Sequence, residues 1–343
     1  MDWASLVILD HLASTAPKFN IIIIKPRTLS IATMDHSLLI TYLYKKQISY
    51  RRHSIQRRFF EKMRKLAILV LGDRPVKMDI HGKIMLMPAS HELPNFISLF
   101  PLYDRLPSHI SNYIYKKMGY VKCIDVGANI GDTISSFYNA EYNFLAIEPS
   151  LNFCEYFESN WRGFSNITLH NSLCTSEDNS LKYEIREVRG TAQANQTENG
   201  SITHQSKLDT IIRSYSDFGN SNILKIDTDG FDFEVILGSK EFIKNNKPAV
   251  LFECDSFGKD DFVDKFFECL QIFIGDGYKK IIFFDNIGNY MSTFDLDIKA
   301  NMDTIKNILL WQQSSRTIYF DILMMSGDMP IEFINNYYSE GIR

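Results

Sequence analysis

Short apolar segments alternate with amphipathic segments from about residue 120 to the end of the chain. Apolar segments of this length are typical of buried strands, and the stretches between them have the spacing of amphipathic helices. The expected strands lie at residues 122–126, 144–148, 167–171, 223–227, 249–253, 280–285 and 317–324. Strands that alternate with helices predict an α/β fold with a doubly wound, mostly parallel sheet and a late antiparallel strand. We therefore expect a Rossmann-like, seven-stranded sheet.

The region before this sheet has a different pattern. Residues 76–88 alternate around His81-Gly82 as in a β-hairpin, and residues 93–117 are typical of a loop followed by an amphipathic helix. Further upstream, residues 19–25 resemble a short strand, whereas residues 37–44 fit a helix or a strand equally well. We divide the chain into an N-terminal extension, residues 1–75, and a main domain, residues 76–343.

The extension contains a strongly basic segment at residues 45–65. Nine lysine and arginine residues stand there against a single acid, Glu61, and Phe59, Phe60 and Met63 are interleaved with them. This composition predicts a basic amphipathic helix. Such a helix could dock on an anionic membrane surface or an acidic protein. The commoner arrangement is a helix packed on its own domain through its apolar side.

Composition and charge narrow the class of protein. The 343 residues are 45% hydrophobic and 23% charged, which is typical of a folded globular protein. A net charge of −4 gives no reason to expect a nucleic acid partner. The sequence has no apolar run near the ~20 residues of a membrane-spanning helix and no basic segment leading into a signal peptide. The five cysteines are scattered, which is typical of reduced thiols in a cytoplasmic protein.

The first expected strand is followed by a glycine-containing turn at residues 125–133. Gly127 and Gly131 let the backbone turn tightly and approach a ligand. The turn lacks the G-x-G-x-x-G spacing of dinucleotide-binding proteins, and Asp125 and Asp132 flank it. Carboxylates at these positions suit a ligand with an ammonium group and no phosphate, such as S-adenosylmethionine. Glu148 ends the next strand, where a carboxylate can accept hydrogen bonds from ribose hydroxyls.

These segments together resemble the FkbM family of methyltransferases. The resemblance covers about residues 80–255 and depends on 124–133, Glu148-Pro149 and 224–232. Much of the family has Glu-Gly followed by Glu in the third segment, whereas this chain has Asp229-Gly230 and Asp232. The resemblance implies a class I methyltransferase fold, S-adenosylmethionine as cofactor and O-methylation of a sugar, glycan or glycosylated small molecule. It implies cofactor contacts from Asp125, Gly127, Asn129, Gly131, Asp132, Thr133, Glu148, Pro149, Ser172 and Leu173.

Transfer of a methyl group to a hydroxyl needs a base or a metal ion beside the acceptor. Asp227 and Asp229 follow the fourth strand and Glu253 ends the fifth, so the fold brings all three to one edge of the sheet. We expect Asp227 or Glu253 to be the base. Lys225 alternates with Asp227 and either assists catalysis or forms a structural salt bridge. Alternatively, Asp227, Asp229 and Glu253 could bind Mg²⁺ through their oxygen atoms.

Two other functions remain open from the sequence. A nicotinamide-dependent oxidoreductase is disfavoured by the glycine spacing of the turn, and a non-catalytic methyltransferase-like binding module is disfavoured by the presence of Asp125, Glu148 and Asp227. The polar stretch 189–205 is either a mobile loop over the cofactor or acceptor, or an inert surface insertion.

Overall fold

The protein is represented by a computed structural model that describes residues 36–179, 182–197, 201–202, 204–256, 259–315 and 318–341. The chain divides into two compact units, Met1–Asp35 and His36–Arg343, and only the second is described below. The strand expected at residues 19–25 lies outside the described residues. Residues 36–75, which we assigned to the extension, belong to the same compact unit as the main domain.

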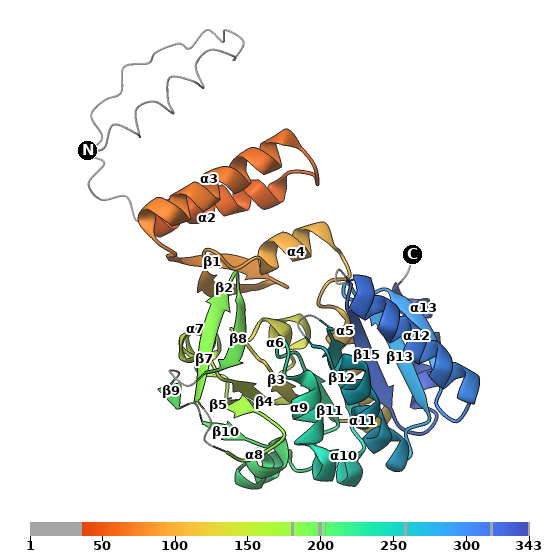
Figure 1. Cartoon of the computed structure of the whole chain (residues 1–343). Coiled ribbons are helices and arrows are strands. Elements are labelled where there is room, and N and C mark those ends of the chain that lie inside the picture. The colour runs from red at the N-terminus through yellow and green to blue at the C-terminus, as the bar shows by residue number, and fades with distance from the viewer. Residues whose placement is uncertain are drawn as a thin grey trace, which may run out of the picture. The chain divides into compact units, whose positions relative to one another are not determined.

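The centre of the domain is one eight-stranded sheet (Figure 1). Its strands, in spatial order, are β14 (Tyr290–Asp295), β13 (Lys280–Asp285), β15 (Phe320–Met325), β12 (Ala249–Cys254), β11 (Ile223–Ile226), β3 (Lys122–Val126), β4 (Asn143–Glu148) and β5 (Ile167–Asn171). The five neighbouring strands β5, β4, β3, β11 and β12 are parallel to one another, whereas β15 runs antiparallel between β12 and β13. The α/β class, the doubly wound order and the late antiparallel strand are as expected. The sequence missed β14, because this edge strand is half polar and has no apolar run.

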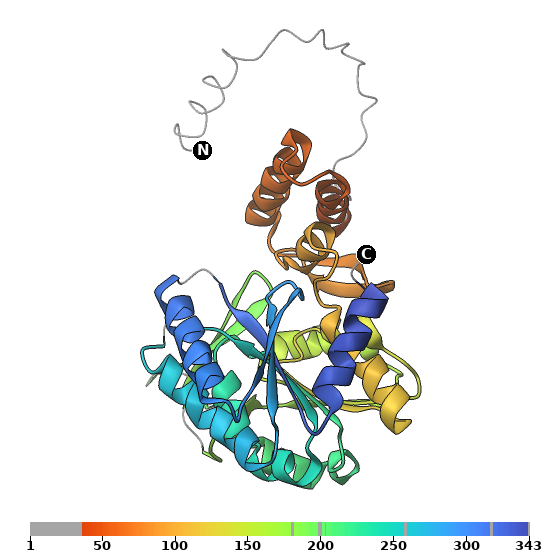
Figure 2. The same ribbon diagram turned by 90° about the vertical axis from the view of Figure 1, so that its right-hand side faces the viewer.

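Helices cover both faces of the sheet (Figures 1 and 2). One core includes side chains of α8 (Leu208–Ser214), α9 (Asp232–Leu237), α10 (Lys240–Asn246), α11 (Phe262–Gly275) and α12 (Lys299–Ser315). The opposite core includes side chains of α5 (Leu106–Met118), α6 (Asp132–Phe137), α7 (Leu151–Trp161) and α13 (Met329–Gly341). Successive residues of β3 enter opposite cores, with Ile124 in the first and Cys123 in the second. This alternation is why buried apolar side chains stand on both faces of the strand.

A smaller layer lies before the sheet in sequence. It contains α2 (His36–Ser49), α3 (Ile55–Leu71), the antiparallel hairpin of β1 (Pro75–Ile80) and β2 (Lys83–Pro88), and α4 (Leu93–Leu99). Figure 2 shows α2 and α3 side by side over this hairpin. Their shared core contains Ile40, Tyr44, Val76 and Met85. The hairpin at residues 76–88 is therefore confirmed, and residues 37–44 are helical.

The basic segment 45–65 is not one helix. It includes the end of α2, a turn, and most of α3, which begins after Ser54 because the Ser54 hydroxyl accepts a hydrogen bond from the amide of Arg57 at 3.2 Å. The side of α3 that faces the domain carries Arg57 and Arg64, both buried, whereas Phe59 and Leu66 are exposed. The inward face of α3 is therefore mixed, because Ala67, Ile68 and Leu71 pack on the core beside these arginines. None of the helices that the structure describes has the length and apolar character needed to cross a bilayer.

A second hairpin follows β5 and projects along the open edge of the sheet. It consists of β7 (Lys182–Val188) and β8 (Thr191–Gln196), with the short strand β9 (Ser201–Ile202) beside β7. Two further short strands, β6 (Leu173–Cys174) and β10 (Gln205–Ser206), pair in parallel below it. All five cysteines of the chain are buried free thiols, as expected.

Candidate active site

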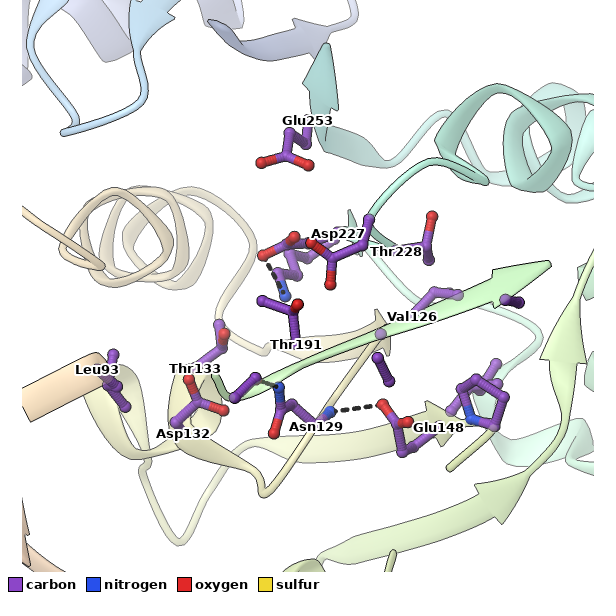
Figure 3. A pocket seen from close by; sticks show the side chains of 18 of the residues that line it. Leu93, Val126, Asn129, Asp132, Thr133, Glu148, Thr191, Asp227, Thr228 and Glu253 are labelled. Carbon is purple, nitrogen blue, oxygen red and sulfur yellow. Dashed lines mark hydrogen bonds and ion pairs between the residues drawn. The ribbon is translucent and has the colours of Figure 1, made fainter. Parts of the chain in front are cut away.

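A cavity of about 160 Å³ opens at the carboxyl ends of β3, β4, β11 and β12. In doubly wound sheets this edge is where ligands bind, because loops from both faces meet there. Figure 3 shows Glu148, Asp227 and Glu253 around the cavity, each at or just beyond the end of a different strand. Since β4, β3, β11 and β12 are consecutive in the sheet, Glu148 and Glu253 lie at opposite ends of this row, with Asp227 between them.

The turn after β3 passes unusually close to the next strand of the sheet. Gly127 has φ +80°, and a Cβ atom added to it would lie 1.8 Å from the carbonyl oxygen of Asp227. Any side chain would therefore force the two loops apart, beyond the cost of the positive φ angle. Gly131 also has a positive φ, and its missing Cβ leaves room for the indole of Trp161, whose Nε1 donates to the Gly131 carbonyl.

Glu148 is held in one orientation at the floor of the cavity. Its Oε2 accepts a hydrogen bond from the amide of Asn129 at 2.8 Å (Figure 3). Its Oε1 accepts one from the amide of Ser150 at 2.8 Å. Each carboxylate oxygen retains a lone pair for a ligand hydroxyl. Burial raises the pKa of Glu148 to about 7, even though the two amide donors act in the opposite direction.

Lys225 is a buried cation that lies between two carboxylates. Its ammonium is 3.2 Å from Asp125 Oδ1 and 3.3 Å from Asp227 Oδ2. Burial alone would lower the pKa of Lys225, but the charges of Asp125 and Asp227 outweigh it and raise the pKa well above its ordinary value. Asp125 is fully buried and does not line the cavity, so its carboxylate contacts Lys225 and cannot reach a ligand directly. Of the two aspartates, only Asp227 faces the cavity.

The remaining carboxylates make the cavity strongly acidic. Burial and the charge of Asp104 raise the pKa of Asp132 to about 8. Burial and the charge of Asp227 raise the pKa of Asp229 to about 7, and the same two causes raise the pKa of Glu253 well above its ordinary range. Mutual repulsion of this kind is relieved by a cationic ligand and increased by an anionic one. The site therefore fits a ligand with an ammonium and a sulfonium, and it disfavours the pyrophosphate of a nicotinamide dinucleotide.

The β7–β8 hairpin closes one side of the cavity. The Asn129 side-chain amide donates to the Gly190 carbonyl at 2.6 Å, and the Glu92 amide donates to the Arg189 carbonyl at 3.2 Å. Gly190 lies against the imidazole of His91, only 2.6 Å from where a Cβ would be. Burial lowers the pKa of His91 to about 4, so this imidazole is neutral near pH 7. The stretch that we expected to be a loop is thus largely an ordered hairpin; residues 198–200 and 203 lie outside the described residues.

The other residues expected at the cofactor lie along the same cavity. Asn129, Thr133, Pro149, Ser172 and Leu173 contribute to its lining, whereas Gly131 does not. Ser172 is buried, and its hydroxyl donates to the His204 carbonyl at 3.0 Å.

A second, smaller cavity of about 80 Å³ adjoins the first. Both are lined by Tyr103, Lys225, Asp227, Glu253 and Tyr319, so these residues form a common wall. The smaller cavity also has Asp104, Asn286 and Asp321 in its lining. The arrangement provides separate spaces for two ligands that meet at Asp227 and Glu253.

Lining residues from the antiparallel strand of the sheet were missed by sequence reasoning. Tyr319 and Asp321 are at the start of β15. Because β15 is antiparallel, its first residues, not its last, reach the ligand-binding edge. The sequence predicted a late antiparallel strand but did not assign it to particular residues, so these side chains were not placed at the ligand-binding edge.

The carboxylates do not converge as metal ligands do. Within the part of the chain that the structure describes, no group of three or more His, Cys, Asp or Glu side chains is placed to hold a metal ion. Asp227 and Asp229 line the same cavity as Glu253 but come from a separate strand end, and Asp227 is paired with Lys225.

The central part of the chain matches a known protein family. Residues 125–280 match the family model of the methyltransferase FkbM domain. No curated protein matches the sequence significantly.

Solved structures are similar only at a distance. A methyltransferase FkbM from Methylobacillus flagellatus has 13% identity and a TM-score of 0.33, with 67% of this chain and 52% of that chain covered. The METTL16 methyltransferase domain has 13% identity and a TM-score of 0.41, with 84% and 91% covered. A precorrin-6y C5,15-methyltransferase from Geobacter metallireducens has 10% identity and a TM-score of 0.30, with 60% and 80% covered.

The fold assignment depends on the strand order of the sheet itself, and the family assignment depends on the match over residues 125–280. The chain therefore carries, over residues 125–280, an S-adenosylmethionine-dependent methyltransferase domain of the FkbM family.

Proposed function

We propose that the protein transfers the methyl group of S-adenosylmethionine to a hydroxyl of a sugar, glycan or glycosylated small molecule. The observation that carries this proposal is the pair of adjoining cavities that share Asp227 and Glu253. The larger cavity has the acidic lining suited to the cationic cofactor, and the smaller one is lined by carboxyl, amide and phenol groups that can hydrogen-bond a polyhydroxylated acceptor.

Glu148 and the turn from Gly127 to Thr133 are the residues that would hold the cofactor. Glu148 would accept hydrogen bonds from ribose hydroxyls through the lone pairs that Asn129 and Ser150 leave available. Asp132 would contribute a negative charge near the ammonium group, and Ser172 and Leu173 would line the adenosine end. When bound, the cofactor supplies an electrophilic methyl group.

Glu253 is the residue that we assign as general base. An acceptor hydroxyl loses its proton as the new bond to carbon forms, so a base in reach of that oxygen lowers the barrier. A carboxylate whose pKa is raised by burial and by the charge of Asp227 holds a proton more strongly than an ordinary glutamate. Asp227 is the weaker candidate because its carboxylate is already paired with the Lys225 ammonium, 3.3 Å away. Asp227 and Lys225 would instead orient the acceptor.

The acidic lining of the smaller cavity also limits the charge of the acceptors that can bind there. Asp104, Glu253 and Asp321 would repel a phosphate or carboxylate group, so we expect a neutral or amino-bearing sugar unit. Tyr103 and Tyr319 provide aromatic rings at the common wall that could pack against a sugar face.

A methyl-transfer screen tests this function. Purified protein and labelled S-adenosylmethionine would be incubated with neutral, amino and phosphorylated sugars, and methylated products would be located by NMR. We expect transfer to a hydroxyl of an uncharged or amino sugar. Glu253→Gln should lower kcat by roughly 10²–10⁴-fold and leave cofactor binding unchanged. Cofactor binding without transfer to any acceptor would favour the binding module, and transfer to a nitrogen or carbon atom would contradict O-methylation.

A further inference from the structure

Helix α3 packs on the domain through two buried arginines together with Ala67, Ile68 and Leu71. Arg64 is almost completely buried; its Nη1 donates to the Ala89 carbonyl at 2.6 Å, and its Nη2 is 2.5 Å from Glu92 Oε1. The guanidinium also lies 4.0 Å from the ring centre of Tyr44. Arg57, two turns earlier, donates to the Tyr50 carbonyl at 3.0 Å. These contacts fix which side of α3 faces the domain.

The opposite side of α3 is apolar and faces outward. Relative exposure is 82% for Ile55, 56% for Phe59, 52% for Leu66, 81% for Leu69 and 71% for Val70. At the 100° spacing of a helix, these side chains fall on one face, opposite the buried arginines. We call this set the α3 apolar face. Nothing in the packing of the described domain requires apolar residues at these positions, because none of them contributes to a core.

Basic side chains gather at one edge of the α3 apolar face, where Lys62 falls between Leu69 and Ile55. Arg58, Lys62 and Lys65 are exposed and lie on adjacent helical positions, and only Lys65 has an ion pair within the helix, with Glu61 at 2.5 Å. Exposed Arg51 and Arg52 precede the helix. The charge is therefore concentrated beside the apolar residues, although the chain as a whole has a net charge of −4.

We propose that α3 docks the protein on the surface of an anionic lipid bilayer. Such a surface offers apolar chains below a layer of negative headgroups, and an interfacial helix matches both with an apolar face bordered by Lys and Arg. Long basic side chains can reach the headgroups while neighbouring apolar side chains enter the acyl boundary. The observed placement of apolar and basic residues on α3 has this form.

Charge favours a bilayer over a second copy of the chain. In a symmetric dimer through α3, the same patch would face itself, and Arg58 and Lys62 would meet like charges. An acidic protein could satisfy the basic residues, but it would need a matching apolar groove for five neighbouring side chains. A bilayer supplies both requirements without a shaped partner.

Docking through α3 would also act on the catalytic cavity. Glu92, which pairs with Arg64, and Leu93, the next residue, both line the larger cavity. Asn95 on α4 accepts a hydrogen bond from Arg57 and from the Gln47 amide at 3.2 Å. The helix that would contact lipid is thus joined by hydrogen bonds to one wall of the active site.

Vesicle co-sedimentation of the full chain tests this proposal. Vesicles of phosphatidylcholine alone would be compared with vesicles containing 30% phosphatidylglycerol, at low and high salt. We expect binding to the anionic vesicles, weakened by salt, and at least tenfold weaker binding by Leu66→Glu/Val70→Glu and by Arg58→Ser/Lys62→Ser. Both double variants alter exposed residues, so thermal unfolding should remain as in the parent chain.

Matched controls separate α3 from general surface effects. Leu310→Glu/Trp311→Glu changes two exposed apolar residues of α12 and should leave vesicle binding intact. No binding to anionic vesicles would overturn the proposal, as would equal loss in the α12 control. A dimer that dissociates in Leu66→Glu/Val70→Glu, with no lipid binding, would show that the face is instead an interface between copies. The readout does not depend on methyl transfer, so failure of the proposed function would not affect it.

Discussion

Glu253 and Asp321 are directly opposite each other on neighbouring antiparallel strands of the sheet. Both line the smaller cavity, and burial together with neighbouring negative charge raises the pKa of each well above its ordinary range. Like charges directly opposite in a sheet are destabilising, so this pair is unfavourable for the fold alone. Its position in the lining of the smaller cavity, with Glu253 also in the common wall, gives it a functional explanation.

The pair predicts a shift in the pH dependence of methyl transfer. In Asp321→Asn, one of the negative charges that raise the pKa of Glu253 is removed, so the pKa of Glu253 should fall. If Glu253 is the base, the rising limb of kcat/KM should move to lower pH. Asp328→Asn, an exposed change of the same charge before α13, should leave the limb in place. An unchanged profile in Asp321→Asn would argue against Glu253 as the base.

The buried ion pair of Lys225 predicts a stability defect. Lys225→Met would leave the fully buried Asp125 without its cation, which should lower the free energy of unfolding by about 3–5 kcal/mol. The double variant Lys225→Met/Asp125→Asn should recover part of this loss, because no uncompensated charge remains. Urea unfolding of the single and double variants measures both values. Additive losses would show that the two residues do not interact.

The turn at Gly127 predicts a steric effect that a second glycine can isolate. Gly127→Ala and Gly163→Ala both place a Cβ at a positive φ angle, but only the first meets a neighbour, the Asp227 carbonyl at 1.8 Å. We expect Gly163→Ala to cost about 1 kcal/mol of stability. Gly127→Ala should cost several times more and weaken cofactor binding. Equal losses in the two variants would mean that the turn is not constrained by Asp227.

The raised pKa values of the cavity carboxylates predict how stability changes with pH. Asp132, Asp229 and Glu148 have folded-state pKa values of about 8, 7 and 7, each above the ordinary value. Between pH 6 and 8 the folded chain therefore binds more protons than the unfolded chain, and its stability should fall as pH rises. We expect a loss on the order of 1–2 kcal/mol in urea unfolding.

One variant and one ligand test whether the cavity carboxylates cause this loss of stability. Asp132→Asn should make stability depend less on pH, because the variant lacks the carboxyl group whose pKa is raised to about 8. S-adenosylmethionine, a cation, should stabilise the protein more at pH 8 than at pH 6, since it binds the ionised carboxylates. Rising stability across this interval, or a cofactor effect of the opposite sign, would contradict the acidic character of the cavity.

The sequence predicted the parts of the site that follow from strand ends. Gly127, Glu148 and Asp227 come directly after or at the end of apolar strands, and parallel strands bring such residues to one edge. The sequence could not show that Asp125 is buried behind the cavity. Strand alternation places Asp125, Lys225 and Asp227 near one another but does not tell which carboxylate faces the cavity. Asp321 was missed because the sequence did not show which strand is the antiparallel one, and only in an antiparallel strand does the first end reach the ligand-binding edge.

The N-terminal helices show a second limit of sequence reasoning. Periodicity identified α3 as amphipathic but not which face turns inward, since a buried arginine is uncommon without partners. Tertiary contacts decide the matter: Arg64 has a carbonyl, a carboxylate and an aromatic ring around it, supplied by residues 20 to 28 positions away. The spacing of polar and apolar residues within α3 gives no information about contacts with residues so far away in the sequence.

Calorimetric titration with S-adenosylmethionine tests the central claim most directly. The parent chain would be compared with Glu148→Ala and with Glu158→Gln, an exposed change on α7 that should have no effect, with NAD as a control ligand. The account predicts binding of S-adenosylmethionine that Glu148→Ala weakens by roughly 10-fold or more, as expected when charge-assisted hydrogen bonds are lost. It predicts no binding of NAD. Absence of cofactor binding by the parent chain, or tight binding of NAD, would contradict it.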